Sequence, residues 1–232
     1  MAATPDRRYH GLMLMRRMCT VVPCMISVTA ATLLPAALPR AEAAPCPDVE
    51  VVFARGRTEP PGTGQIGQAF VNAVRARTDK SVGFYAVNYP ADTEVIQGAN
   101  DMSRHIQSMA ANCPDTRLVL GGYSLGAAVT DVVVAVPSPI FGYNNPLPLG
   151  MDNHIAAVAL FGNGTRKVLG PVSAISPLYG DKTIDLCTLD DPICNTNLDF
   201  NTWAENWPSH QYSAYADSGL IDQAATFVAA RL

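Results

Sequence analysis

One turn near the middle of the chain constrains the fold more than any other feature. An apolar run at 118–120 leads into Gly122-Tyr123-Ser124-Leu125-Gly126, and a run of small residues typical of a helix follows. In a G-x-S-x-G elbow the chain passes sharply from strand to helix, and glycines flank the serine because larger side chains would collide with neighbouring backbone. The serine hydroxyl is then exposed beside a helix N-terminus, which stabilises negative charge. An ordinary β-to-α turn can show the same pattern, but the strand before it and the helix after it favour a nucleophilic Ser124.

Strands and helices alternate along the rest of the chain. Short apolar or β-branched runs predict strands at 49–53, 82–87, 118–120, 155–161 and 183–186. Apolar residues at helical spacing predict helices at about 66–74 and 102–112, from the elbow to about 136, and at 218–232. The segment 137–153 holds four prolines and predicts a loop. Strands that alternate with helices indicate a parallel sheet covered on both faces.

The first 44 residues differ in composition from the rest of the chain. Two arginines precede an apolar run at 18–34, which Pro23 interrupts, and an A-x-A cleavage pattern follows at 41–44. This order is typical of a signal peptide. Pro23 and the small residues after the apolar run argue against a permanent membrane span. We therefore expect a secreted domain formed by residues 45–232, with no stable membrane span.

Charge and cysteine content narrow the class of protein further. Residues 45–232 carry 11 basic and 18 acidic side chains, a net charge of −7, which leaves no basic patch for nucleic acid. An even number of cysteines in an exported domain predicts two disulfides, and three pairings of the four are possible. No C-x-x-C or clustered Cys/His spacing is present, so we expect no metal site and no cofactor. The four cysteines are Cys46, Cys113, Cys187 and Cys194.

A serine nucleophile requires a base, and the base requires an orienting carboxylate. In folds that carry this elbow the chain order is serine, acid, histidine. His105 precedes Ser124, and His154 lies far from any suitable acid in that order, whereas His210 lies downstream in a loop before the last predicted helix. His210 is therefore the expected base, and a surface loop histidine is the alternative.

Two neighbouring aspartates are the strongest candidates for the acid. Asp190 and Asp191 lie in the segment 187–194, which begins and ends with a cysteine. A disulfide across this segment would hold a carboxylate rigidly at the end of a strand, as an orienting residue requires. The alternative is a solvated turn with a purely structural bridge. The candidate acids between the serine and the histidine are Asp152, Asp181, Asp185, Asp190, Asp191 and Asp199.

Taken together, these motifs resemble the cutinases, small secreted serine esterases, and most of all their bacterial cutinase-like branch. The resemblance covers nearly all of residues 45–232. It implies an α/β-hydrolase-type three-layer sandwich with a mainly parallel central sheet and no large lid, and it implies hydrolysis of carboxylic esters. The matching motifs are Phe53-Ala54-Arg55-Gly56 with Thr58-Glu59, the elbow, Cys187 with Asp191-Pro192-Ile193-Cys194, and His210.

The resemblance also implies a role for each site residue. Ser124 would be the nucleophile, His210 the base, and Asp191, four residues after the first loop cysteine, the acid. The backbone N–H of Leu125 and a donor near Arg57 would bind the oxyanion. In the family pattern Cys46 pairs with Cys113, and Cys187 pairs with Cys194.

Two residues depart from the family pattern and keep other functions open. Leu125 stands where glutamine is usual, and Arg57 stands where a residue with a hydroxyl is usual. A phospholipase, lipase or thioesterase of the same fold would use the same triad. A non-catalytic secreted surface or antigenic protein on a hydrolase scaffold is the other alternative. We expect a monomeric esterase for short- to medium-chain esters or lipids, with the loop 137–153 and Trp207 either lining an acyl crevice or packing without a role in binding.

Overall fold

The computed structural model describes residues 45–198 and 200–232, so the predicted signal peptide, 1–44, lies outside the described residues. A five-stranded, all-parallel sheet forms the centre, with the strand order β2-β1-β3-β4-β5. This arrangement confirms the predicted α/β sandwich. The strands are β1 (Val49–Ala54), β2 (Val82–Ala86), β3 (Arg117–Tyr123), β4 (Ile155–Phe161) and β5 (Thr183–Leu186).

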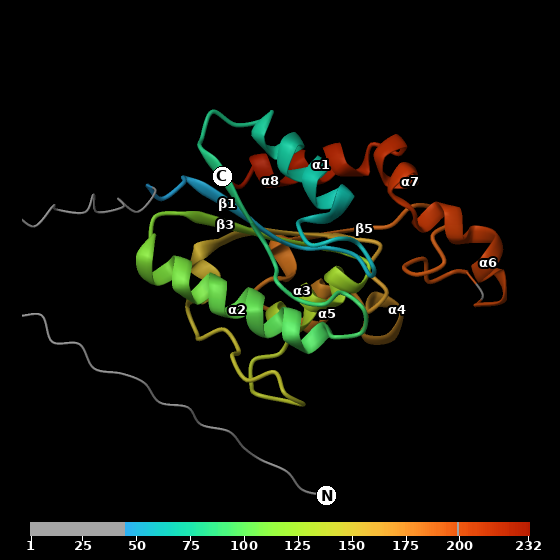
Figure 1. Cartoon of the computed structure of the whole chain (residues 1–232), viewed down its shortest axis with the longest axis horizontal. Helices are drawn as coiled ribbons and strands as arrows, with labels where there is room; N and C mark the ends of the chain where they lie inside the picture. The colour runs from blue at the N-terminus through green and yellow to red at the C-terminus, as the bar shows by residue number, and fades with distance from the viewer. Residues whose placement is uncertain (1–44, 199) are drawn as a thin grey trace, which may run out of the picture. The chain divides into compact units, whose positions relative to one another are not determined.

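Helices cover both faces of the sheet. Figure 1 shows α1 and α8 over one face and α2 and α3 over the other. The longer helices are α1 (Gly64–Arg75), α2 (Val95–Asn112), α3 (Leu125–Ala135) and α8 (Leu220–Ala229). The shorter helices are α4 (Arg166–Leu169), α5 (Val172–Ile175), α6 (Trp203–Asn206), α7 (Tyr212–Asp217) and the 3-10 helices η1 (Met151–His154), η2 (Gly180–Lys182), η3 (Phe200–Thr202) and η4 (Trp207–His210).

The two faces of the sheet bury two separate cores because successive side chains of a strand point to opposite faces. Val52 of β1 belongs to the core that α2 and α3 cover, whereas Phe53 belongs to the core that α1 and α8 cover. All six residues of β1 are buried, as expected for the central part of a parallel sheet. Packing on both faces therefore holds the strands, including their carboxyl ends, in fixed positions.

Several element boundaries differ from the sequence prediction, and the largest difference is at α2, which begins at Val95 rather than near Met102. β3 extends to Tyr123 through two glycines, because it pairs with β1 on one side and β4 on the other. The C-terminal helix begins at Leu220 rather than at Ser218, since Gly219 has a φ of 75° and separates it from α7. A left-handed residue of this kind ends a helical run.

Two disulfides are present in the described part of the chain. Cys46, before β1, is bonded to Cys113, after α2, and Cys187 is bonded to Cys194 in the loop after β5. The Cα–Cα distances are 5.6 and 5.8 Å. The pairing that the resemblance implies is therefore confirmed.

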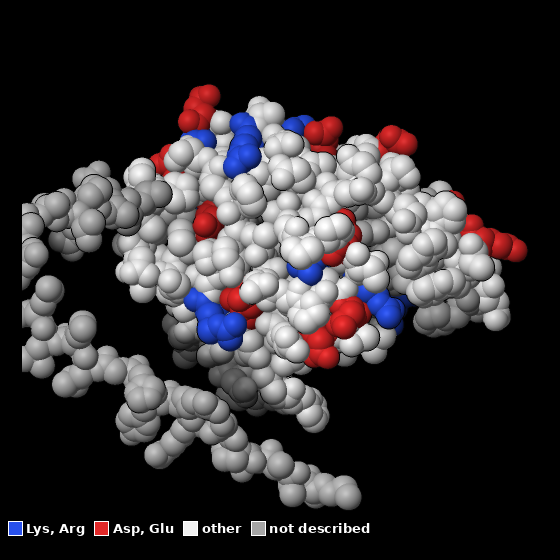
Figure 2. Space-filling view, in the orientation of Figure 1, with Lys and Arg blue, Asp and Glu red and all other residues white. Residues whose placement is uncertain are grey.

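On the face shown in Figure 2, basic side chains lie singly or beside acidic ones, with wide uncharged areas between them. Within residues 45–198 and 200–232, none of the helices combines the length and the apolar character needed to span a bilayer.

A buried polar cluster joins α3, β4 and β5. The side-chain amide of Asn163, which follows β4, donates to Asp131 of α3 at 2.9 Å and to Asp185 of β5 at 3.2 Å. Burial raises the pKa of Asp185 to about 6; the Arg166 guanidinium opposes this shift, and the neighbouring Asp131 carboxylate adds to it. Burial also raises the pKa of Asp131, one of whose carboxylate oxygens has no hydrogen-bond partner.

The raised pKa of Asp185 predicts a pH-dependent loss of stability. The unfolded chain releases the Asp185 proton near pH ~4, whereas the folded protein keeps it until pH ~6. The free energy of unfolding should therefore fall between these values, by up to about 3 kcal/mol for this group. The Asp185→Asn variant should lack this component, so its stability should fall less from pH ~4 to ~7. Urea unfolding of both proteins at the two pH values measures the difference, and equal pH dependence would contradict the assignment.

Candidate active site

Ser124 lies at a sharp turn between β3 and α3. Its backbone has a φ of 55° and a ψ of −116°, a conformation that non-glycine residues rarely adopt and that marks functional turns. Its N–H donates to the carbonyl of Phe161 in β4 at 2.9 Å. A side chain at Gly122 would overlap the carbonyl of Gly126, and one at Gly126 would overlap the carbonyl of Ala54. The elbow therefore requires both glycines, and it places the Ser124 hydroxyl at the carboxyl end of the sheet.

The structure brings Ser124, His210 and Asp191 into one row. His210 Nε2 lies 2.8 Å from Ser124 Oγ, and His210 Nδ1 lies 2.7 Å from Asp191 Oδ2. The imidazole and the carboxylate are both buried, with 2% and 0% of their surface exposed. Asp190, by contrast, is exposed. Of the two neighbouring aspartates, Asp191 is thus the one that faces the imidazole.

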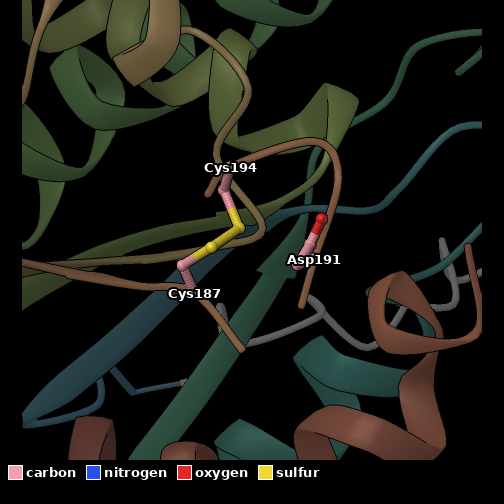
Figure 3. A group of neighbouring side chains, drawn as sticks. All are labelled: Cys187, Asp191 and Cys194. Atoms are coloured by element: carbon pink, nitrogen blue, oxygen red, sulfur yellow. A yellow bond between two sulfur atoms is a disulfide. The ribbon is translucent and has the colours of Figure 1, made fainter. Parts of the chain in front are cut away.

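The loop 187–194 holds the Asp191 carboxylate in place. Figure 3 shows Asp191 on the segment that the Cys187–Cys194 disulfide closes. Asp191 Oδ1 accepts the N–H of Ile193 at 2.7 Å, and Oδ2 accepts both the His210 ring and the hydroxyl of Tyr215, the latter at 2.6 Å. The two sulfur atoms close to Asp191 are bonded to each other and offer no thiolate, so this group of residues does not fit a metal ion.

His210 is held by residues from three different elements. The Tyr123 hydroxyl donates to its carbonyl, and the two rings lie 5.1 Å apart. The hydroxyl of Thr188 donates to the carbonyl of Ser209 at 2.6 Å. Gly162, with a φ of 59°, lies against the imidazole, since a Cβ there would be 2.8 Å from His210 Cε1. Only glycine lets the backbone approach the imidazole this closely.

The other two histidines of residues 45–232 lie elsewhere. His105 Nε2 is 2.6 Å from Glu50 of β1, and its ring stacks on Tyr85 with 3.5 Å between the ring centres. Glu50 is at the start of β1, and His154 directly precedes β4. In a parallel sheet these positions belong to the amino edge, opposite the carboxyl edge at which Ser124 lies.

The serine opens into a cavity of about 560 Å³. Its lining includes His210, Trp207 and the exposed Arg57. The loop 137–153 does not line this cavity; part of it lines another, of about 330 Å³, with residues 175–179. The loop starts at the C-terminus of α3, whose 11 residues put this start about 16 Å from the serine, and at Gly142 the loop contacts α2. Of the two predicted wall elements, Trp207 lines the cavity into which the serine opens, and the loop does not.

The motif at 53–59 fixes the loop between β1 and α1. The buried Arg55 guanidinium donates to the carbonyl of Glu59 at 2.8 Å and to that of Tyr89 at 2.6 Å. The Glu59 carboxylate accepts the N–H of Gly56 at 2.6 Å and that of Gln65 at 2.8 Å. These contacts order the backbone on which Arg57 sits, at the rim of the cavity.

Two positions near Ser124 are candidates for binding a negative charge. Leu125 is the first residue of α3, so no carbonyl within the helix accepts its N–H. Arg57 lines the cavity, and its carbonyl accepts the Thr58 hydroxyl at 2.6 Å. The Thr58 hydroxyl therefore donates within its own loop rather than into the cavity. The exposed Arg57 side chain places a positive charge at the cavity.

The protein is of the α/β-hydrolase type. This class is defined here by the all-parallel sheet, the serine elbow at its carboxyl edge and the serine–histidine–carboxylate row. Residues 45–232 match the model of the Cutinase family. The chain belongs to this family, and it is a serine ester hydrolase.

The relatives carry names of ester hydrolases. "Probable carboxylesterase Culp2" of Mycobacterium tuberculosis is 58% identical over 228 residues, covering 95% of this chain and 98% of the relative. "Phospholipase Culp4" of the same species is 50% identical over 220 residues, covering 94% of this chain and 92% of the relative. A solved Trichoderma reesei cutinase with a phosphonate inhibitor has a TM-score of 0.60 and 28% identity, covering 79% of this chain and 76% of that one. An acetylxylan esterase structure has a TM-score of 0.65 and 25% identity, covering 81% of this chain and 99% of that one.

Proposed function

We propose that this protein is a secreted carboxylic ester hydrolase that works through an acyl-enzyme on Ser124. The observation that carries the proposal is the row of two short contacts, 2.8 Å from Ser124 Oγ to His210 and 2.7 Å from His210 to Asp191, at the edge of an open cavity. Secretion is supported by the signal-peptide pattern and by two disulfides, which persist in oxidising compartments.

The proposed reaction has two acyl-transfer steps. Ser124 Oγ attacks the ester carbonyl carbon while its proton passes to His210 Nε2, and Asp191 holds the imidazole in the required tautomer. The backbone N–H groups of Leu125 and Arg57 bind the oxyanion. Collapse of the tetrahedral intermediate breaks the bond to the alcohol, which leaves with the proton from His210. Water then attacks the acyl-enzyme by the same route, and the acid is released.

Labelling with a fluorophosphonate tests this function and separates it from a non-catalytic scaffold. We expect the wild-type protein to bind the probe covalently on the peptide that contains Ser124, and we expect Ser124→Ala to remain unlabelled. The rates of hydrolysis of p-nitrophenyl esters of increasing acyl-chain length, and of phospholipid vesicles, then show which of these substrates the enzyme prefers. Labelling that persists in the alanine variant would contradict the assignment.

Phospholipid hydrolysis is the second candidate, and Arg57 favours it. The exposed guanidinium lines the same cavity as Ser124, so an anionic group of a substrate can pair with it. A family member named "Phospholipase Culp4" is 50% identical to this chain. Arg57 also replaces a hydroxyl that the family pattern offers to the oxyanion. We therefore propose an esterase that is weak on neutral esters and prefers anionic ones.

Substitution of Arg57 tests this preference. Arg57→Ser should raise kcat on neutral p-nitrophenyl esters, by at most the 10²–10³-fold that one oxyanion donor contributes, because it restores a hydroxyl. It should also lower the ratio of anionic to neutral phospholipid hydrolysis. Arg57→Lys is the matched control, which keeps the charge without a hydroxyl and should keep the preference. Lower turnover of Arg57→Ser on every ester would instead make the Arg57 guanidinium, besides its backbone N–H, a donor to the oxyanion.

A further inference from the structure

Tyr215 of α7 contacts the proposed catalytic row from behind. Its hydroxyl lies 2.6 Å from Asp191 Oδ2, the same oxygen that lies 2.7 Å from His210 Nδ1. The hydroxyl is also 3.5 Å from Cys194 Sγ, but a disulfide sulfur cannot donate and is a weaker acceptor than a carboxylate oxygen. The Tyr215 hydroxyl therefore donates to the closer Asp191 carboxylate, and Tyr215 is fully buried.

The Tyr215 hydroxyl remains a donor over the whole pH range in which a histidine titrates. Burial raises the pKa of Tyr215, and the neighbouring Asp191 carboxylate raises it further. A hydrogen bond to a carboxylate favours its charged form and withdraws part of its negative charge. The Asp191 carboxylate oxygen that faces His210 therefore accepts two hydrogen bonds throughout this pH range, one from His210 and one from Tyr215.

We propose that Tyr215 is a positioning residue that, acting through Asp191, sets the lower pH limit of ester hydrolysis. The inference rests on the function proposed above for Ser124, His210 and Asp191. By drawing charge from Asp191 Oδ2, the phenol weakens the attraction of the carboxylate for a protonated imidazole. His210 then stays neutral, and able to accept the serine proton, at lower pH than it would beside a carboxylate with a single donor.

Other titratable or charged groups lie near this row. The Lys167 ammonium donates to the main-chain carbonyl of Pro192, next to Asp191, at 3.0 Å. The Tyr123 hydroxyl of β3 donates to the main-chain carbonyl of His210 and not to Asp191. The Glu59 carboxylate accepts two backbone N–H groups, and Arg57 lies on the exposed rim of the cavity. The Asp131 and Asp185 carboxylates accept the side-chain amide of Asn163, and Arg166 donates to Asp185. Among the described side chains, Tyr215 is the hydroxyl that reaches the carboxylate.

Tyr215→Phe removes this donor and keeps the ring. The acid limb of kcat/KM against pH reports the ionisation of the base in the free enzyme. We expect this limb to move upward by about one pH unit in Tyr215→Phe on a neutral p-nitrophenyl ester, since a hydrogen bond to a charged group commonly shifts a pKa by this much. A purely structural role would lower kcat/KM at every pH and leave the limb in place.

Tyr123→Phe is the matched control, because it removes a buried hydroxyl that binds the His210 main chain and leaves Asp191 untouched. Its acid limb should coincide with that of the wild-type enzyme. An unmoved limb in Tyr215→Phe, or an equal shift in Tyr123→Phe, would overturn the inference.

A second variant decides the question even if Tyr215→Phe does not fold. Replacing Tyr215 with 3-fluorotyrosine keeps the hydrogen bond and makes the phenol a stronger donor, so the limb should move downward by a few tenths of a unit. No shift, or an upward one, contradicts the inference. Ser124→Ala, measured beside these variants, separates the two proposals: if it retains activity the proposed function fails, and if it is inactive while the limbs stay fixed only the role of Tyr215 fails.

Discussion

Replacing Ser124 with alanine is expected to lower kcat for ester hydrolysis by about 10⁶-fold, the loss known for the nucleophile of such triads. His210→Ala should have a similar effect, because in the proposed mechanism the serine loses its proton across the 2.8 Å contact between its hydroxyl and His210. The two losses should not add in the double variant, since the residues act as one unit. The fold should survive, because glycines and backbone bonds build the elbow, not the serine oxygen.

Steady-state kinetics on p-nitrophenyl esters, with circular dichroism as the check on folding, measure these losses. Ser213→Ala and His154→Ala are matched controls: Ser213 is exposed, and His154 lies at the amino edge of the sheet. Both should keep wild-type kcat. A His210→Ala enzyme that retained most of its kcat would remove His210 from the mechanism.

The second large effect is expected at Asp191. Asp191→Asn should lower kcat by about 10⁴-fold, because the amide favours the wrong histidine tautomer. The carboxylate is fully buried, and each of its oxygens accepts a hydrogen bond, so the substitution places an N–H₂ group where an acceptor is required. Asp190→Asn is the matched control one residue away and should change kcat little, because Asp190 is exposed. The reverse ranking of the two variants would assign the acid to Asp190.

Local physical rules allowed much of the sheet and the elbow to be predicted from the sequence. The strand at 155–161 has the predicted bounds because a run of apolar residues defines a buried strand without tertiary information. The need for glycine at 122 and 126 was also predictable, because the atoms that a side chain would meet there belong to the elbow itself or to the adjacent strand β1. The disulfide pairing needed the resemblance to a family, because spacing alone leaves three pairings.

The segment before the last helix shows where local rules fail. The apolar pattern at 218–232 predicted the last helix, which is α8, but the loop predicted before it contains a further short helix, α7, which ends just before the left-handed Gly219. The loop 137–153 was a candidate wall of the site, but part of it packs against α2 and part lines another cavity. Helix periodicity reports which face of a segment is buried, and it does not report where the next segment goes.

The sequence by itself determined three features of this protein: the serine, histidine and aspartate residues from which a site can be built, the elbow that exposes Ser124, and the alternation of strands and helices that builds a parallel sheet. The resemblance implied Asp191, and the tertiary structure shows that Asp191 rather than Asp190 faces the imidazole, that Tyr215 donates to Asp191 and that Gly162 lies against His210. The reason is physical: Gly162 lies 48 residues from His210 and Tyr215 lies 24 residues from Asp191, and the order β3-β4-β5 with the packing of α7 brings these residues to one edge of the sheet. Contacts across such separations depend on the sheet order, which no local pattern encodes.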